Sequence, residues 1–324
     1  MIKKVLSGMR PTGRIHLGHY FGVLKNWIKF QDKYECYYML ADLHALTTEC
    51  YNTSKINENI FDMVADWIAV GVDPNKVTIF RQSKIPQHSE LFLILSMFTP
   101  LNRLYRCPTY KEKFKKVKND SSHNYGFLGY PILMSADILL YESDIVPTGR
   151  DQASHIEFTR EIAKKFNNLY GKVLKVPCKK FTKVSKLPGL DGRKMSKSYN
   201  NSILISENSD TLKHKIENMF TDPLKIRKND IGHPYGCIVF SFNNVFNKNC
   251  NDLEEKCRTG KIGCMTCKKQ LIEIIHEFIK PFSENRKKII SDKRYLENII
   301  SSGCDRAIRI AEKTIKKIYE VLKF

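Results

Sequence analysis

The opening of the chain contains a strand, a turn and the start of a helix in the stretch Ile2-Lys3-Lys4-Val5-Leu6-Ser7-Gly8-Met9-Arg10-Pro11-Thr12-Gly13-Arg14-Ile15-His16-Leu17-Gly18-His19. Ile2 to Leu6 has the length and composition of a short buried strand. The residues after it are rich in glycine and proline, as turns are. A helix is predicted from about His16 to Phe30. A strand that leads through a tight turn into a helix is the repeating unit of α/β folds.

Strand and helix signals continue to alternate through the first half of the chain. Cys36 to Leu40 and Val77 to Phe80 are apolar runs of strand length. Between them, Ser54 is expected to cap a helix that ends at Gly71. The apolar residues of this helix recur every three or four positions: Ile56, Ile60, Met63, Trp67 and Val70. The alternation predicts a Rossmann-like parallel sheet.

The second half of the chain changes character. Ile138 to Leu140 and Asp144 to Val146 indicate one more strand-and-turn region, and a helix follows from about Gln152 to Phe166. From Ser206 onward strand signals nearly vanish. Apolar residues at helical spacing mark three helices, at Leu212 to Met219, Leu271 to Phe278 and Ala307 to Leu322. An α/β domain followed by a helical domain is therefore expected, with the boundary near Lys186 to Asn201.

The composition is that of a globular protein, with 42% hydrophobic and 27% charged residues. No apolar run approaches the roughly 20 residues of a membrane span, and Met1-Ile2-Lys3-Lys4 leads directly into a strand, so we expect neither a membrane protein nor a cleaved leader. We expect a cytoplasmic protein. The net charge of +20 suits a polyanionic partner such as nucleic acid. A general bias toward Lys, Asn and Ile explains the charge equally well.

Chemistry is first indicated by the two histidines of the stretch Arg10 to His19, which we call the histidine turn. His16 and His19 are three residues apart at a helix start, and residues at this spacing share one helix face. The helix start offers free N–H groups and a positive dipole end to an anion. Gly18 between them allows close approach of a ligand. The pattern suits a triphosphate, although four residues alone do not exclude ordinary surface histidines.

A second basic turn lies at the expected domain boundary, in Asp191-Gly192-Arg193-Lys194-Met195-Ser196-Lys197-Ser198, which we call the lysine turn. Lysine is a compact, mobile charge that can follow a departing pyrophosphate. An exposed basic linker is the alternative in a chain this rich in lysine. Neither a P-loop pattern nor Gly-x-Gly-x-x-Gly occurs in the sequence.

Together and in this order, the two turns resemble the signature sequences of class I aminoacyl-tRNA synthetases. Further stretches resemble the tryptophanyl-tRNA synthetases among them: Ser7 to Gly13, Ala41 to Thr47, Tyr130 to Leu139 and Val146 to Gln152. The resemblance covers nearly the whole chain. It implies a Rossmann-like catalytic domain at 1–190, a mobile lysine loop at 191–200, and a helical anticodon-binding domain at 201–324 that carries a cysteine cluster and the C-terminal helix.

The resemblance also implies an activity, which is the activation of L-tryptophan with Mg²⁺-ATP to tryptophanyl-adenylate and its transfer to tRNA(Trp) by a homodimer. Catalytic roles at the phosphates then belong to His16, His19, Lys194 and Lys197. Other residues at matching ATP-contacting positions are Arg10, Pro11, Thr12, Gly18, Gly149, Arg150, Asp151, Leu187, Met195, Ser196 and Ser198. Arg10 and Arg150 depart from the family, since many members carry glutamine and glutamate there.

The resemblance places the amino-acid pocket around Asp137, whose family counterpart accepts the indole N–H. Indole has one donor, and a fixed buried acceptor rejects rings that lack it. The alternative is that Asp137 caps the segment Ile138–Tyr141. Four other residues are expected at this pocket: Tyr130, Met134, His44 and Gln152.

Five of the ten cysteines fall between Cys237 and Cys267. Cys257-x6-Cys264-x2-Cys267 with Cys237 upstream supplies four thiolates, which suit tetrahedral zinc or a four-iron cluster. Nearby basic residues are expected to favour deprotonated sulfur: Lys256, Arg258, Lys261, Lys268 and Lys269. Similarity to a subset of the family implies a structural [4Fe–4S] cluster. Cys250 is a rival ligand, and a set of buried free thiols is the third interpretation.

Three other functions remain open at this point. A tyrosyl-tRNA synthetase shares both signature turns. A non-catalytic RNA-binding paralogue fits the charge but leaves the histidines and lysines without a purpose. An iron–sulfur protein of nucleic-acid repair fits the cysteines and the charge, but it does not fit the first half of the chain.

Overall fold

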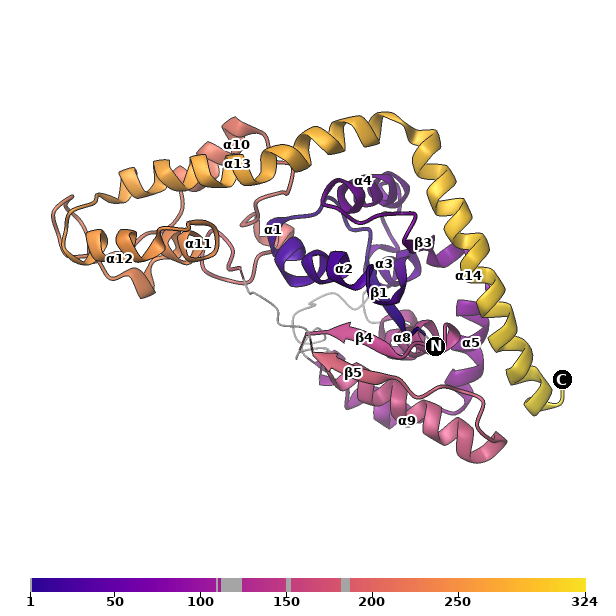
Figure 1. Cartoon of the computed structure of the whole chain (residues 1–324). Coiled ribbons are helices and arrows are strands. Elements are labelled where there is room, and N and C mark those ends of the chain that lie inside the picture. The colour runs from indigo at the N-terminus through magenta and orange to yellow at the C-terminus, as the bar shows by residue number, and fades with distance from the viewer. Residues whose placement is uncertain (1, 109, 112–123, 150–152, 182–186) are drawn as a thin grey trace.

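The fold is built on a sheet of five parallel strands in the order β3-β2-β1-β4-β5. A computed structural model describes residues 2–108, 110–111, 124–149, 153–181 and 187–324 (Figure 1). The strands are β1 Lys4–Met9, β2 Glu35–Leu40, β3 Val77–Arg81, β4 Ile145–Thr148 and β5 Cys178–Phe181. The order reverses direction at β1, where the chain crosses from one half of the sheet to the other. The predicted Rossmann-like α/β class is confirmed.

Helices join and cover the strands. Those of the first part are α1 Leu17–His19, a π-helical turn Tyr20–Leu24, α2 Lys25–Phe30, α3 Asp42–Glu49, α4 Ile56–Ala69, α5 Gln87–Met97, α6 Leu101–Tyr105, α8 Tyr125–Leu140 and α9 Ala153–Tyr170. Those of the second part are α10 Ser209–Glu217, α11 Ile238–Phe246, α12 Cys250–Arg258, α13 Cys264–Ser291 and α14 Lys293–Leu322. Among the described residues, 3₁₀ turns lie at Gln82–Lys84, Lys197–Tyr199 and Pro234–Gly236. The helical second part is also as predicted.

The core lies between the sheet and the helices. Strand β2 is buried on both faces after its first residue, as expected when helices cover both sides of a parallel sheet. Trp27 of α2 stacks on Tyr38 of β2 with ring centroids 4.0 Å apart, and Trp67 of α4 meets Trp27 edge-on at 4.9 Å. All three rings are fully buried. These large side chains fix α2 and α4 on one face of the sheet.

Two local predictions are wrong. Ile138 to Leu140 is the last turn of α8, because a short apolar run does not distinguish a strand from a buried helix, and Pro131 inside the helix concealed the pattern. Ser54 does not cap α4. Lys55 holds the N-cap position, and the Ser54 hydroxyl donates instead to Asn52. The predicted end of α4 holds, since Gly71 adopts a φ of 111° just beyond it.

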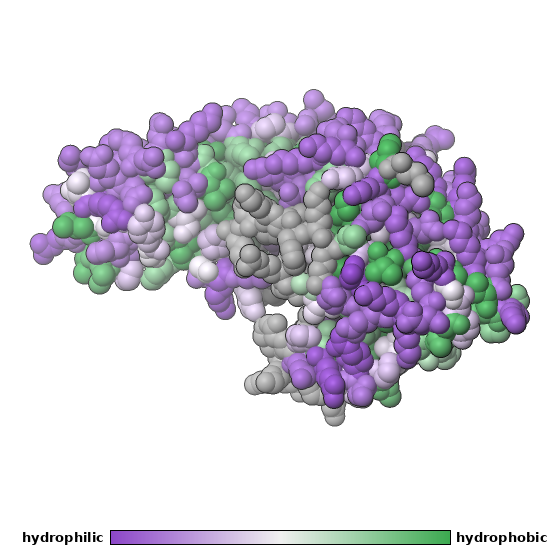
Figure 2. Space-filling view, turned by 60° about the horizontal axis from the view of Figure 1, so that its bottom comes forward, coloured by the Kyte–Doolittle hydropathy of each residue, from purple (hydrophilic) through white to green (hydrophobic). Residues whose placement is uncertain are grey.

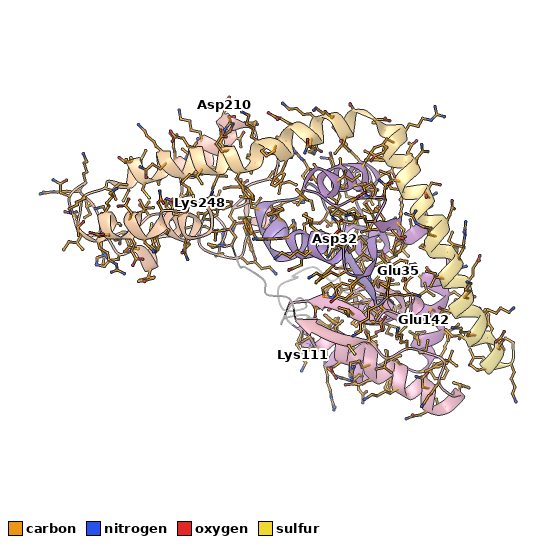
Figure 3. All side chains as sticks on the ribbon, in the orientation of Figure 1. Asp32, Glu35, Lys111, Glu142, Asp210 and Lys248 are labelled. Atoms are coloured by element: carbon orange, nitrogen blue, oxygen red, sulfur yellow. The ribbon has the colours of Figure 1, made fainter. Side chains whose placement is uncertain are left out.

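The helices α10 to α13 project away from the sheet (Figure 1), and the labelled Asp210 and Lys248 lie on this projecting part (Figure 3). Helix α13 runs back toward the sheet and is followed by α14 after a break at Asp292. Most of the face in Figure 2 is hydrophilic, with apolar residues at the far end of the projection. None of the helices in the described ranges is long and apolar enough to cross a bilayer.

Helix α14 closes the free edge of strand β3. In a parallel strand every second residue directs its backbone groups to the same side, and Val77, Ile79 and Arg81 direct theirs away from β2. Arg306 donates to the Val77 carbonyl at 3.3 Å, and the Arg81 amide donates to the Cys304 sulfur at 3.4 Å. Gly303 lies so close that a Cβ there would overlap the Ile79 carbonyl oxygen. The helix thus covers this edge, with hydrogen-bond partners at Val77 and Arg81 and a close approach at Ile79.

Candidate active site

The histidine turn follows β1 and brings two imidazoles into contact. The rings of His16 and His19 stack with centroids 3.6 Å apart. Nδ1 of His16 accepts from the His19 amide at 3.3 Å, and Nδ1 of His19 accepts from the His16 amide at 3.4 Å. A neutral imidazole that accepts at Nδ1 carries its proton on Nε2. Both rings therefore have an Nε2–H to donate to a ligand.

Gly18 is required by this packing. A Cβ at position 18 would lie 3.0 Å from the His16 ring and 3.3 Å from Cβ of Met195. The Gly18 amide also contacts the Met195 sulfur at 3.3 Å. Since Met195 belongs to the lysine turn, the missing side chain lets the two turns approach each other.

Burial and nearby cations keep both histidines neutral at pH 7. Burial, followed by the charge of Lys197, lowers the pKa of His16 to about 4. Burial and the neighbouring His16 lower the pKa of His19 well below its ordinary value. Two neutral N–H donors are consequently held beside two lysines, an arrangement that favours an anionic ligand.

The lysine turn is organised by Asn201, which the sequence did not single out. The buried Asn201 amide accepts from the Ser196 N–H at 2.8 Å and donates to Asp191 at 2.7 Å and to the Lys194 carbonyl at 3.2 Å. A Cβ on Gly189 would overlap this amide. The only available signal is an asparagine after a turn, which is too common to have identified it.

The two turns meet. The ammonium of Lys197 donates to the Thr12 carbonyl at 3.3 Å and lies 3.0 Å from the place of a Cβ on Gly13. The chain beyond the lysine turn pairs with the histidine turn, since the Leu17 amide donates to Ile203 at 2.8 Å and the Ile205 amide donates to Ile15 at 3.1 Å. Motifs far apart in the sequence thereby line one site.

The lysines differ in exposure. Burial lowers the pKa of Lys197 to about 8. Lys194 is exposed, yet its charge also lowers the pKa values of His16 and His19. Positive charge is therefore concentrated at the histidine pair, as binding of a polyphosphate requires.

A second centre lies around Asp137, which is inside α8 and caps nothing. Its Oδ1 accepts from Gln82 at 2.8 Å and from His88 at 2.6 Å, and its Oδ2 accepts from His44 at 2.8 Å. Burial alone raises its pKa, but His44 and His88 lower the pKa well below the ordinary range. A carboxylate has about four acceptor sites. These three donors leave room for one more at Oδ2.

Gln82 and His88 are functional candidates that the sequence reading missed. Both are fully buried, and Nε2 of His88 accepts from the Tyr141 hydroxyl at 2.7 Å. Gln82 directly follows β3. Polar residues beyond the carboxyl ends of parallel strands line ligand sites in this class of fold, and this rule could have identified Gln82. No pattern pointed to His88.

Some of the other residues expected at the amino-acid pocket lie on the same helix as Asp137. Met134 and Tyr130 are half-buried on α8, one and two helical turns before Asp137. The Tyr130 hydroxyl contacts Nε2 of His155 at 3.3 Å. Gln152 lies outside the described residues.

The remaining nucleotide candidates are distributed as follows. The Arg10 guanidinium donates to the Thr48 hydroxyl of α3. Pro11 and Leu187 are buried, and Gly149 directly follows β4. Arg150 and Asp151 lie outside the described residues, and nothing is described of the Ser198 side chain.

All ten cysteines are free thiols, and four of them meet where α11, α12 and α13 converge. Cys237 precedes α11, Cys257 is near the end of α12, and Cys264 and Cys267 share the first turn of α13. Within the described parts of the chain, no three His, Cys, Asp or Glu side chains form a group that could hold one metal ion. Cys267 is nevertheless within electrostatic reach of Cys237, Cys257 and Cys264, and of the rival Cys250.

The expectation that basic residues favour thiolates does not hold at Cys267 and Cys257. Burial, and then the neighbouring Cys237, raise the pKa of Cys267 to about 12. Burial also raises the pKa of Cys257, against the charge of Lys225. The cations named from the sequence do not offset the loss of solvent.

Comparison with known proteins agrees with this geometry. The family model for class I tRNA synthetases (W and Y) matches residues 3–280. A tryptophan–tRNA ligase of Thermotoga maritima is 43% identical, with 97% of each chain covered, and one of Aquifex aeolicus is 38% identical, with 98% of this chain and 99% of the relative covered.

Solved structures of tRNA synthetases are similar to this chain as well. A tryptophanyl-tRNA synthetase from Campylobacter jejuni, complexed with ADP and tryptophan, matches with a TM-score of 0.90 at 33% identity, covering 99% of this chain and 100% of that one. A tyrosyl-tRNA synthetase from Archaeoglobus fulgidus shares the fold, with a TM-score of 0.66 at 20% identity. The chain belongs to the class I tRNA synthetases and, among them, to the tryptophan–tRNA ligases.

Proposed function

We propose that the tryptophan–tRNA ligase reaction of this chain starts where the histidine turn meets the lysine turn. The tryptophan carboxylate attacks the α-phosphorus of ATP, which enters as its Mg²⁺ complex. The bond from this phosphorus to the bridging oxygen breaks, and pyrophosphate leaves. A ribose hydroxyl at the 3′ end of the tRNA then takes the acyl group and releases AMP. Positioning and charge stabilisation suffice, since no protein nucleophile is needed.

His16 and His19 act as N–H donors to the α- and β-phosphates, while Lys194 and Lys197 follow the β- and γ-phosphates. The fixed Nε2–H donors support the first role, because a donor already aimed at developing charge needs no reorganisation. Contact with phosphate oxygens raises the pKa of Lys197 and keeps it an ammonium. Roles for Gly149, Arg150, Asp151 and Leu187 at the nucleotide remain predictions.

One observation carries this proposal, namely the convergence of Lys197 on Thr12 and Gly13. Exchange of labelled pyrophosphate into ATP tests it, with tryptophan and tyrosine offered separately. We expect exchange with tryptophan alone, and a large loss of exchange in a Lys197→Met variant. Exchange without tryptophan dependence, or an unaffected Lys197→Met, contradicts the proposal.

We propose that Asp137 accepts the indole N–H at its free acceptor site, with Tyr130, Met134, His44 and Gln152 completing the pocket. The three donors on the carboxylate support this role because they keep it ionised and fix its direction. A phenol ring has no donor at the same place, so the pocket discriminates against tyrosine.

We propose that tRNA(Trp) is bound across a catalytic part at 1–190, a mobile loop at 191–200 and a helical anticodon-binding part at 201–324. Positive charge supports contact with the projecting helices. Exposed cations there include Arg227, Lys228, Lys256, Arg258, Lys261 and Lys269. We further place the protein in the cytoplasm, where these substrates occur and thiols stay reduced.

We propose that Cys237, Cys257, Cys264 and Cys267 hold a [4Fe–4S] cluster. Each iron of such a cluster binds one thiolate, so its ligands are more widely spaced than those of one zinc ion. Support for this ligand set is that Cys237, Cys257 and Cys264 lie within electrostatic reach of Cys267. When bound, the cluster would cross-link α11, α12 and α13 and stabilise the projecting part.

Anaerobic purification followed by iron and zinc assays tests the cluster. We expect iron, and a broad visible absorption that is lost in Cys264→Ser. Cys250→Ser is the matched control, because Cys250 acts less on Cys267 than the other three do. Retention of iron in Cys264→Ser, or its loss in Cys250→Ser, contradicts the proposed ligand set, and stoichiometric zinc favours the alternative metal.

We propose that the protein is a homodimer joined through α5, α6 and α8. These helices expose large apolar side chains, which a monomer rarely leaves in contiguous patches: Leu93, Met97, Leu101, Tyr105 and Tyr125. Light scattering should give twice the chain mass for the wild type and the chain mass for Leu93→Glu. Leu169→Glu, at an exposed leucine of α9, is the control. A monomeric wild type refutes the dimer.

A further inference from the structure

A buried carboxylate lies behind the histidine turn and is not used by the chemistry proposed above. Asp66 of α4 is fully buried. Its Oδ2 accepts from the backbone amide of Ile15 at 3.0 Å, immediately before His16. Asp66 therefore fixes the backbone that carries the proposed phosphate donors.

The other oxygen of Asp66 connects to the second half of the chain. Its Oδ1 accepts from Nε of Arg286 at 2.7 Å, and a guanidinium nitrogen of the same arginine pairs with Asp62. Arg286 is on α13, the helix that extends into the projecting part (Figure 1). A continuous chain of polar contacts thus runs from α13 through Asp66 to Ile15.

Two cations of the site also face this cluster. Arg14 and Lys197 lie within electrostatic reach of Asp66. The Arg14 guanidinium donates to the Ser206 carbonyl at 3.3 Å, just beyond the lysine turn. The two acids of α4 therefore lie at the junction of the histidine turn, the lysine turn and α13.

A contribution to folding stability does not by itself explain the buried ion pair of Asp66 and Arg286. Desolvation of a buried ion pair commonly cancels its attraction, and well-packed apolar residues stabilise the same place equally well. Apolar residues, however, offer no acceptor to the Ile15 amide and no directional contact to α13. What the charged pair adds is a defined geometry.

We propose that Asp66 is a positioning residue of the adenylation site, and that Arg286 is its partner on α13. Asp66 fixes the position of the Ile15 backbone amide and hence the direction of the His16 and His19 donors. Because Arg286 holds the other oxygen, the placement of α13 is transmitted to the phosphate end of the site. This inference rests on the roles proposed for the two histidines.

The test is the double variant Asp66→Leu with Arg286→Leu, which restores apolar packing without the acceptor. We expect cooperative unfolding close to that of the wild type. We also expect pyrophosphate exchange to fall by roughly 10- to 100-fold with a higher KM for ATP, since misplacement of about 1 Å is costly. The KM for tryptophan should stay unchanged, because the Asp137 pocket is built from other elements.

Asp66→Asn is the second variant, and it keeps an amide oxygen for Ile15. This variant should recover most of the rate of pyrophosphate exchange. If the site needed only the negative charge of Asp66, the rate would not recover. Hydrogen exchange at the amides of residues 15–19 gives a readout independent of activity. These amides should exchange faster in the double variant than in Asp66→Asn.

The control is Asp32→Asn in the exposed pair of Asp32 with Lys76, 2.7 Å apart. It should alter neither the rate of pyrophosphate exchange nor the KM values for ATP and tryptophan. Wild-type kinetics in the double variant overturn the inference, as does an equal loss of tryptophan binding. A failure of the proposed function would look different. The wild type itself would then lack tryptophan-dependent pyrophosphate exchange, while the hydrogen-exchange comparison between the variants could still be made.

Discussion

At the scale of single residues, Asp137 shows how a specificity group is held. Its three donors come from α3, from the turn after β3 and from α5. No one of these segments could fix the carboxylate alone. The acceptor for the indole N–H is thereby directed before the substrate arrives, and pre-organisation of this kind lowers the cost of binding.

Replacement of Asp137 by Asn should raise the KM for tryptophan by about 10- to 100-fold, since a hydrogen bond to a charged group is worth about 1.5–3 kcal/mol. The KM for ATP should stay within the error of measurement, because the nucleotide site lies at the other turns. Steady-state pyrophosphate exchange measures both constants. A parallel rise in both would show that the carboxylate acts on the fold and not on the pocket.

His16 makes stability depend on pH. Its pKa is about 4 in the folded chain and 6.5 ordinarily. Between these values the unfolded chain binds more protons, so the free energy of unfolding falls as the pH drops from 6.5 toward 4. The slope is about 1.4 kcal/mol per pH unit for each proton.

Denaturant unfolding at pH 7, 6 and 5 measures this slope in the wild type and in His16→Gln. The variant should show a shallower dependence, because it has lost one group that must remain neutral in the folded chain. Identical slopes would mean that His16 is not responsible for the dependence.

The element of greatest consequence is the lysine turn, and it depends on Asn201. Removal of the amide leaves the Ser196 N–H and the Lys194 carbonyl without the partner that each has now. Asn201→Ala should therefore loosen the turn and raise the KM for ATP about tenfold, with a loss of about 1–3 kcal/mol in unfolding free energy.

Tyr199→Ser is the matched control for Asn201→Ala. Tyr199 is exposed directly after the lysine turn, and the Arg193 guanidinium lies over its ring at 4.5 Å. Its loss should leave the KM for ATP unchanged. A similar effect of both substitutions would show that the turn is sensitive to any change and not to the Asn201 amide.

The lysine turn itself could be predicted from the sequence, but the side chains that hold it in place could not. Strand-to-helix alternation and the two basic turns follow from local patterns, which are visible in one dimension. The contacts of Asn201, His88 and Asp66 join residues distant along the chain, so no spacing rule reveals them. The helix around Asp137 was missed for a related reason, since its residues are almost all apolar and no polar face marks it as a helix.

At the scale of the whole molecule, α14 packs against the sheet at the edge of β3. Gly303→Ala should destabilise the protein by about 1–3 kcal/mol or more, because the new methyl group overlaps the Ile79 carbonyl and overpacking forces the backbone apart. Thermal and denaturant unfolding measure this loss. Ser301→Ala, at an exposed position of the same helix, should have no effect.

Other contacts also tie α14 to the body of the protein. Lys317 pairs with Glu142 at 2.6 Å, where the labelled Glu142 lies between the sheet and this helix (Figure 3), and the Thr314 hydroxyl donates to the Leu140 carbonyl at 2.8 Å. These contacts hold α14 against the body of the protein.

The cover over β3 has a consequence for how the protein behaves while it is being made. An uncovered edge of Val77 to Arg81 is a template on which strands from other chains can align, and such alignment begins aggregation. The helix that protects it, Lys293–Leu322, is synthesised long after the strand itself. Until α14 has been made this strand stays open, so nascent chains, and chains cut short before α14, should depend on chaperones far more than the folded protein does.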